Sequence, residues 1–260
     1  MECILSALVK GSSRDGAFFF FLIGKMWLEA SPSVELENII YRHTVELPLK
    51  ERQRNSSNFV KLIMLMSHHL LDCLILVIRS IDYSCSFNTQ AELVLFVKNY
   101  SHGQYAKEIA FNVCDCLEAQ FEQIPCATSF SWLIDLLDSD IVLNWINCKP
   151  AYRAKIIAYH LPAPSFKEQY VPELTLKVLE RYGDDEKVFR RFLSGIHAFE
   201  TYNLDNVKEN STETFTVLED YKKHSHALIR KWAEYETDRI KALVEEKEQL
   251  DLIDDRFGDN

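Results

Sequence analysis

Apolar residues recur every three or four positions through most of the chain, the spacing that places them on one face of an α-helix. Residues 171–182 give the clearest case, with a stripe of Val171, Leu174, Val178, Leu179 and Tyr182. Pro172 suits a first helical turn, Gly183 suits a helix end, and Asp184 can cap the following helix. That helix has its own stripe of Val188, Phe189, Phe192 and Ile196, so the pattern predicts a tight helical hairpin over residues 171–196.

Helix, short polar turn and helix alternate through the rest of the C-terminal two thirds. The turns lie near residues 102, 139, 183 and 224, roughly 40 residues apart, which is typical of HEAT-like helical arrays. The helix after the first turn has a stripe of Ala106, Ile109, Ala110, Val113 and Leu117. We therefore predict an all-α protein in which residues 85–260 form a HEAT-like solenoid of helical hairpins, closed by a charged capping helix.

The N-terminal portion, residues 1–84, fits this repeat less well. Helices are predicted at 15–29, 33–46 and 57–80, separated by polar connectors, so we expect an irregular helical portion. Residues 62–78 are almost continuously apolar but have His68, His69 and Asp72 at their centre. Ionisable groups are costly in the middle of a bilayer, which favours a buried helix over a membrane span.

Residues 225–240, SHALIRKWAEYETDRI, resemble the second helix of a HEAT-like repeat. The matching positions are Ile229, Arg230, Trp232, Ala233 and Ile240. Ser225 and His226 replace the Pro or Asp that often precedes such a helix. If the Trp232 indole is buried, Trp232→Ala is expected to cost about 3–5 kcal/mol.

The C-terminal ninety residues are also similar to the helical-repeat regions of large bacterial proteins, including antiviral-defence NTPases and related sensors. The resemblance implies a recognition or scaffolding subunit that binds another protein, as part of a defence or signalling assembly. It implies no enzymatic activity. A helical-repeat protein of this kind is expected to present its exposed faces between hairpins to its partner.

Charge narrows the choice of partner. The formal net charge is −10, and residues 200–260 carry sixteen acids against nine bases. Such a chain repels a phosphate backbone, so nucleic-acid binding is disfavoured. The acidic C-terminal part also permits an alternative function, an acidic inhibitor that occupies the basic site of a nuclease or DNA-binding protein.

Cysteines and short motifs exclude several chemistries. The seven cysteines have no regular spacing and several lie in apolar runs, which predicts reduced thiols and a cytoplasmic location. The N-terminal residues show no export signal. Glycine-rich phosphate loops, HExxH and CxxC are absent, so we expect no cofactor and no metal. His68 and Asp72 share an i, i+4 spacing, but a core histidine bonded to an acid is favoured over a metal site.

A helical ribonuclease of the HEPN type is the enzymatic alternative. Such proteins have an Arg and a His separated by about four to six residues, and Arg191 with His197 has this spacing. Arg153 with His160 is a second instance. The His would act as general base on a ribose hydroxyl while the Arg held the phosphate. Phe192 stands where that family usually has a polar residue, which weakens the match.

Residues 194–203, SGIHAFETYN, are predicted to form a loop between two hairpins and to contact the protein partner. Its mixture of aromatic and polar residues suits recognition. The candidate partner-binding residues are Gly195, His197, Glu200, Thr201 and Tyr202. The alternative is that Phe199 and Tyr202 only pack the loop against the helices.

Overall fold

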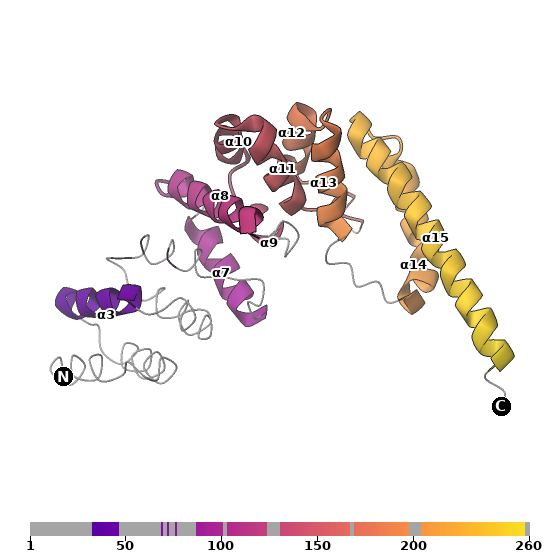
Figure 1. The fold of residues 1–260 in the computed structure, drawn as a ribbon, viewed down its shortest axis with the longest axis horizontal. Coiled ribbons are helices and arrows are strands. Elements are labelled where there is room, and N and C mark those ends of the chain that lie inside the picture. Colours follow the sequence, from indigo (N-terminus) through magenta and orange to yellow (C-terminus); the bar gives the residue numbers. More distant parts are fainter. Residues whose placement is uncertain are drawn as a thin grey trace. The chain divides into compact units, whose positions relative to one another are not determined.

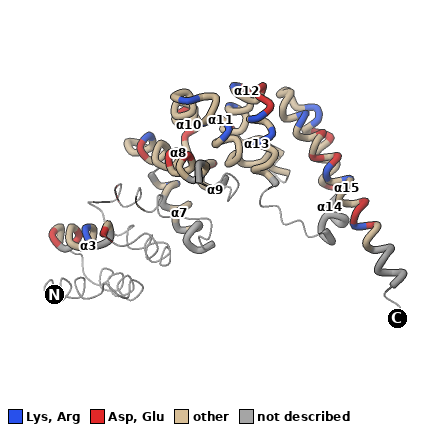
Figure 2. Tube along the Cα trace, viewed as in Figure 1, with Lys and Arg blue, Asp and Glu red and all other residues tan. Residues whose placement is uncertain are grey.

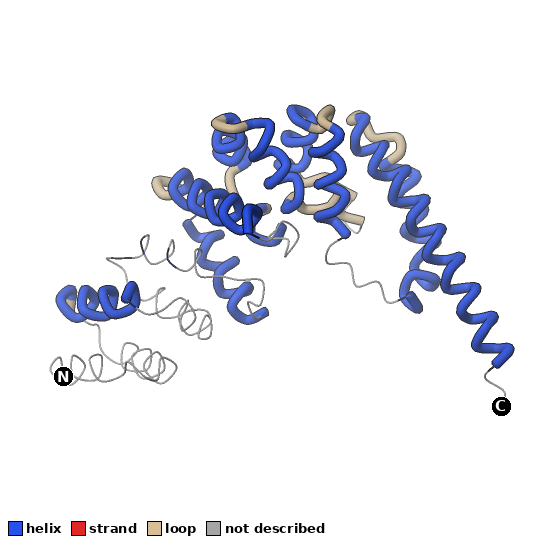
Figure 3. Tube along the Cα trace, in the orientation of Figure 1, coloured by secondary structure: helices blue, strands red, loops and turns tan. Residues whose placement is uncertain are grey.

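A computed structural model describes residues 33–46, 69, 72, 76, 87–100, 103–123, 131–166, 169–197 and 204–257. These residues are 79% helical, and no strand occurs among them (Figure 1 and Figure 3). The predicted all-α class is therefore confirmed for the described part of the chain. The predicted boundary between residues 84 and 85 lies outside it.

The described helices follow one another in chain order. They are α3 (Val34–Glu46), α7 (Phe87–Tyr100), α8 (Ala106–Gln123), α9 (Ser131–Ile134), α10 (Ser139–Asn147), α11 (Pro150–His160), α12 (Glu173–Tyr182), α13 (Glu186–His197), α14 (Leu204–Tyr221) and α15 (Ala227–Phe257). Contacts divide the chain into two compact units, the first containing residues 1–128 and 132–148 and the second containing residues 129–131 and 149–260.

In the first unit, α8 packs against α7 and α10. The predicted stripe of α8 is confirmed, because all five of its residues, Ala106, Ile109, Ala110, Val113 and Leu117, are buried. Asp138 caps α10, its carboxylate accepting hydrogen bonds from the backbone N–H groups of Asp140 and Ile141. The buried Trp145 on α10 donates its indole N–H to Asp115 on α8, with 2.8 Å between Nε1 and Oδ1.

In the second unit, α11 packs against both α12 and α13. The predicted stripes that run into α12 and along α13 are buried except for the half-buried Tyr182; the buried residues are Val171, Leu174, Val178, Leu179, Val188, Phe189, Phe192 and Ile196. The two helices are joined by a tight turn, as predicted, but the extensive packing of α13 is with α11, a helix that the sequence pattern did not single out.

The N-cap of α13 is Asp185 rather than the predicted Asp184, since the Asp185 carboxylate accepts a hydrogen bond from the Lys187 N–H at 2.9 Å.

The last two helices, α14 and α15, pack side by side and are joined by a short turn at residues 222–226 (Figure 1). Ile229, Trp232, Ala233 and Ile240 of α15 are buried, as the repeat-like pattern predicted. With 31 residues α15 is much longer than α14, which has 18. Beyond Ile240, the described side chains of α15 are half-buried or exposed.

None of the described helices is long and apolar enough to cross a membrane. The apolar stretch at residues 62–78 lies outside the described residues except for His69, Asp72 and Leu76.

Candidate functional site

The predicted partner loop at residues 194–203 begins inside a helix. Gly195 and His197 belong to α13, and Gly195 is buried, so the prediction that they lie in a loop is wrong. A Cβ on Gly195 would lie 1.9 Å from the Tyr159 carbonyl oxygen of α11. Glycine is thus required for the close approach of two helices. Glu200, Thr201 and Tyr202 lie outside the described residues.

The two ribonuclease-like pairs lie on different helices. Arg191 is half-buried on α13 and His197 is the last residue of that helix; the His197 side chain is outside the described part. Arg153 and His160 both belong to α11. Only 5% of His160 is exposed, and burial lowers its pKa to about 3. A histidine so enclosed cannot reach a ribose hydroxyl, which argues against the second pair.

His69, the described member of the His68–His69 pair, takes part in packing. His69 stacks on Tyr41 of α3 with ring centroids 4.1 Å apart, and its Nε2 lies 2.6 Å from the Asn38 side-chain oxygen. Its backbone N–H donates to the Glu37 carboxylate at 3.3 Å. His68 is outside the described residues and Asp72 is exposed. Among the residues that the structure describes, no group of three or more His, Cys, Asp and Glu could hold a metal ion.

Hydrogen bonds from distant residues hold the loop of residues 161–172 between α11 and α12, which we call the anchored loop. Of its twelve residues, 167 and 168 are outside the described part. The Ser165 N–H donates to the Tyr170 carbonyl oxygen at 2.9 Å, which closes the loop on itself. Such a closure fixes the backbone at both sides of the loop tip.

Two side chains from outside the anchored loop hold its backbone. The Tyr221 hydroxyl, at the end of α14, donates to the carbonyl oxygens of Ser165 at 2.7 Å and of Tyr170 at 3.1 Å. Thr175, fully buried on α12, donates its hydroxyl to the Pro162 carbonyl at 2.9 Å. Burial, together with the nearby Tyr170, raises the pKa of Tyr221 to about 12, so its hydroxyl keeps the donated proton even above pH 10.

Aromatic packing also holds the anchored loop, through its residue Phe166. The Phe166 ring lies 5.8 Å from that of Trp232, and the Trp232 ring meets Tyr221 edge-on at 5.3 Å. Trp232 is fully buried, and its indole N–H has no hydrogen-bond partner in the described structure. Ring packing therefore fixes the position of Trp232, as is common for large aromatic anchors.

The residues that follow the tip of the anchored loop, Gln169 and Tyr170, are exposed, and Gln169 is strained. Gln169 has a φ of 51°, the left-handed region that is unfavourable for residues with a Cβ. Both Gln169 and Tyr170 are exposed, Tyr170 to 45%. A strained residue persists only where its surroundings hold it, and such residues concentrate at functional sites. The loop therefore presents an aromatic and an amide side chain beside a backbone that hydrogen bonds hold at Ser165 and Tyr170.

The sequence pattern did not point to this loop. Its composition is nevertheless typical of a rigid connector, because Pro162, Pro164 and Pro172 surround a tyrosine. The anchors could not have been found this way, because Tyr221 lies 56 residues from Ser165 and 51 from Tyr170.

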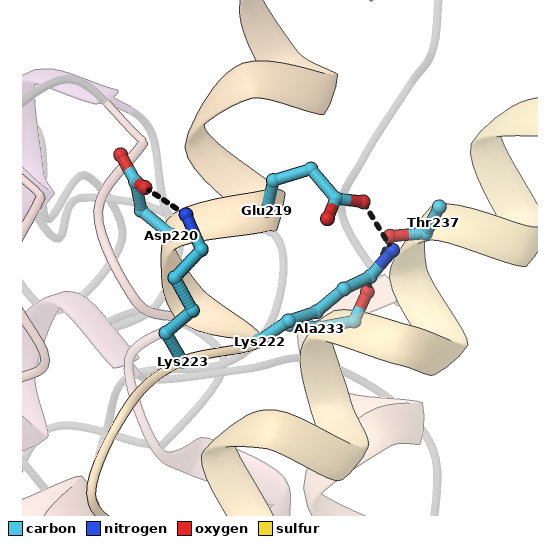
Figure 4. A network of polar contacts seen from close by, with 6 residues as sticks. All are labelled: Glu219, Asp220, Lys222, Lys223, Ala233 and Thr237. Carbon is cyan, nitrogen blue, oxygen red and sulfur yellow. Dashed lines mark hydrogen bonds and ion pairs between the residues drawn. The ribbon is translucent and has the colours of Figure 1, made fainter.

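The turn between α14 and α15, residues 222–226, is held by local polar contacts. Lys222 pairs with Glu219 at 2.6 Å and Lys223 with Asp220 at 3.1 Å (Figure 4). Figure 4 also shows a bond within α15, from the Thr237 hydroxyl to the Ala233 carbonyl at 2.7 Å. Arg230 donates to the carbonyl oxygens of His224 and Ser225 at 2.7 and 2.8 Å. These local bonds stabilise the turn. We therefore interpret it as a structural element that positions Tyr221 beside the anchored loop.

Comparisons with protein-family models, with curated protein sequences and with solved structures each found no match to this chain.

Proposed function

We propose that this chain is a protein-interaction module that recognises another protein through the anchored loop of residues 161–172. The observation that carries the proposal is the exposed pair of the strained Gln169 and Tyr170, next to backbone carbonyls that Tyr221 and Thr175 hold. A HEAT-like scaffold and a role in a bacterial defence or signalling assembly are the wider context suggested by the sequence resemblance.

Preorganisation is the physical reason for assigning recognition to this loop. Ordering a flexible loop on binding costs free energy, and a loop that is already fixed avoids that cost. Holding Gln169 in a left-handed conformation costs on the order of 1 kcal/mol in the unbound protein. Tyrosine is among the residues that most often dominate protein–protein binding energy. The anchored loop combines these properties in two neighbouring exposed residues.

The proposal is tested by quantitative affinity capture with the intact chain from lysate of its source organism. Tyr170→Ala should reduce capture of the specific partner about tenfold, the loss expected for one central aromatic contact. Tyr235→Ala on α15 is the matched control, because Tyr235 is a tyrosine of the same exposure, 45%. It should leave capture unchanged.

The Tyr221→Phe variant tests the rigidity of the anchored loop separately from the contact that the Tyr170 side chain makes with a partner. It removes the hydroxyl that donates to Ser165 and Tyr170 but leaves the exposed Tyr170 side chain in place. Capture should weaken, and amide hydrogen exchange at residues 165–170 should accelerate. If the same proteins are captured equally by the wild type and the Tyr170→Ala variant, the anchored loop is not the recognition site.

A further inference from the structure

One histidine in the turn between α14 and α15 uses its side chain and both of its backbone polar groups to close that turn. The His224 N–H donates to the Tyr221 carbonyl oxygen at 3.0 Å, and the His224 carbonyl oxygen accepts from Arg230 at 2.7 Å. The ring Nδ1 of His224 accepts a hydrogen bond from the backbone N–H of His226 at 3.1 Å. His224 thus joins the end of α14 to the start of α15.

The hydrogen bond at Nδ1 requires a neutral His224 ring. A backbone N–H can only donate, so Nδ1 must be the acceptor and the ring proton must lie on Nε2. Protonation places a hydrogen on both ring nitrogens, which makes Nδ1 a donor. Two N–H groups then face each other, and the hydrogen bond to His226 is lost.

The charges that act on His224 oppose its protonation. Desolvation lowers the pKa of its ring below the ordinary value of 6.5, and the charges of His226 and Arg230 lower it further. A charged ring would also lie near the N-terminal end of α15, where the helix dipole is positive.

Further charged groups surround the turn on three elements. Gly183 lies close to Leu228, which brings the α12–α13 turn beside the start of α15. The groups are the pairs Glu219–Lys222 and Asp220–Lys223 at the end of α14, Lys231 on α15, and Asp184 and Asp185 in the α12–α13 turn. Figure 2 marks the basic residues near the start of α15 in blue. Because each acid at the end of α14 is paired with a lysine, neither offers an uncompensated negative charge to His224.

Tyr221 connects His224 to the anchored loop. The Tyr221 carbonyl oxygen accepts from His224, while its hydroxyl donates to the carbonyl oxygens of Ser165 and Tyr170. Its ring also packs edge-on against Trp232 of α15, at 5.3 Å. A turn that opens at His224 therefore frees the residue that holds the loop.

We propose that His224 makes the anchored loop sensitive to pH. In acid the protonated ring opens the turn, Tyr221 releases the carbonyl oxygens of Ser165 and Tyr170, and the loop loses these two supports. The sign follows from the lowered pKa: below pH 6.5 an opened turn binds a proton that the closed turn excludes, so acid favours the opened turn. The effect on partner binding rests on the proposed function, because a loop that must be ordered on binding binds more weakly.

Amide hydrogen exchange of the intact chain, corrected for the intrinsic effect of pH, measures the opening at residue 226 and at residues 165–170. His224→Asn is the informative variant, because its Oδ1 lies as many bonds from the backbone as Nδ1 does but does not titrate. Both proteins should be equally protected at pH 7. At pH 5 the wild type should exchange about tenfold faster than His224→Asn at both places, the effect of losing one hydrogen bond.

Two further variants control the experiment. His224→Ala has no acceptor at this position, so it should exchange fast at both pH values. His160→Gln removes the histidine on α11 whose burial also makes the unit sensitive to acid. It should still open in acid, because it retains His224.

Equal exchange of the wild type and His224→Asn at pH 5 would overturn the proposal. A turn that opens at residue 226 while residues 165–170 stay protected would overturn it too. Capture of the partner at pH 5 should be weaker for the wild type than for His224→Asn, and equal at pH 7. If the loop opens in acid and capture does not change, the pH switch stands and recognition through the anchored loop is refuted.

Discussion

Several polar side chains of the 149–260 unit are buried with a defined hydrogen-bond partner. Thr175 donates to the Pro162 carbonyl, Thr237 donates to the Ala233 carbonyl, and Glu236 pairs with Arg239. A buried polar group costs free energy unless it is paired, so these contacts compensate for their burial. Burial of His160 has another consequence. It lowers the pKa of the imidazole, so the free energy of unfolding depends on pH.

His160 should make the protein less stable in acid. Its pKa is about 3 in the folded protein against an ordinary value of 6.5, so below pH 6.5 the unfolded chain binds a proton that the folded chain does not. Lowering the pH from 7 to 5 should therefore lower the free energy of unfolding by about 2 kcal/mol through this group alone. Urea unfolding of the wild type and of His160→Gln at both pH values measures the difference.

That contribution should be missing from His160→Gln, which keeps hydrogen-bonding capacity but does not titrate. An equal loss of stability in both proteins between pH 7 and pH 5 would assign the acid sensitivity to other groups.

Among the elements of the second unit, α11 and α13 pack closely at Gly195. Gly195 allows this approach, since a Cβ there would lie 1.9 Å from the Tyr159 carbonyl oxygen and 2.6 Å from its carbonyl carbon. Backbone atoms cannot move aside as a flexible side chain can. Gly183 is similarly close to Leu228, whose Cδ1 would lie 2.2 Å from an added Cβ, so it brings the α12–α13 turn close to α15.

Gly195→Ala should destabilise the protein although alanine is the better helix former. In an ordinary helix interior the change would stabilise by roughly 0.5–1 kcal/mol. Here the collision with the Tyr159 backbone should dominate and cost about 1–3 kcal/mol. Chemical denaturation gives the value. Ser194→Ala, one position earlier on the exposed side of α13, is the control and should change stability little. A stabilised Gly195→Ala variant would contradict the close packing of α11 on α13.

Across the chain as a whole, contacts define two compact units, and each has a large buried tryptophan. Trp145 belongs to the first unit and Trp232 to the second. The indole N–H of Trp145 donates to Asp115, whereas Trp232 is held by ring contacts with Phe166 and Tyr221. Each ring is therefore a local probe of its own unit.

Trp145→Ala and Trp232→Ala should each destabilise mainly the unit that contains the replaced ring, by about 3–5 kcal/mol. Hydrogen exchange followed peptide by peptide measures this. Trp232→Ala should speed exchange in α14 and α15 and leave α8 unchanged, and Trp145→Ala should do the opposite. Equal acceleration in both units by either variant would show that they unfold as one.

The spacing of apolar residues predicted the helices and their buried faces, because helical periodicity depends on residues that are neighbours in the sequence. The stripes of α8, α13 and α15 are buried as predicted. Residue composition placed Gly195 in the loop predicted at residues 194–203, although the stripe that ends at Ile196 placed it inside the helix, where the structure has it. The sequence pattern paired α13 with α12 because they are adjacent in sequence, whereas the structure packs α13 against α11.

The order of residues was enough to establish that the described chain is helical, which faces are buried, and that its acids gather toward the C-terminal end. Tertiary packing was needed to establish which faces meet, why Gly195 must lack a side chain, and that residues 161–172 are held by Tyr221 from more than fifty residues away. The reason is physical: helix formation depends on contacts within a few residues, whereas packing depends on the shapes of surfaces that are distant along the chain.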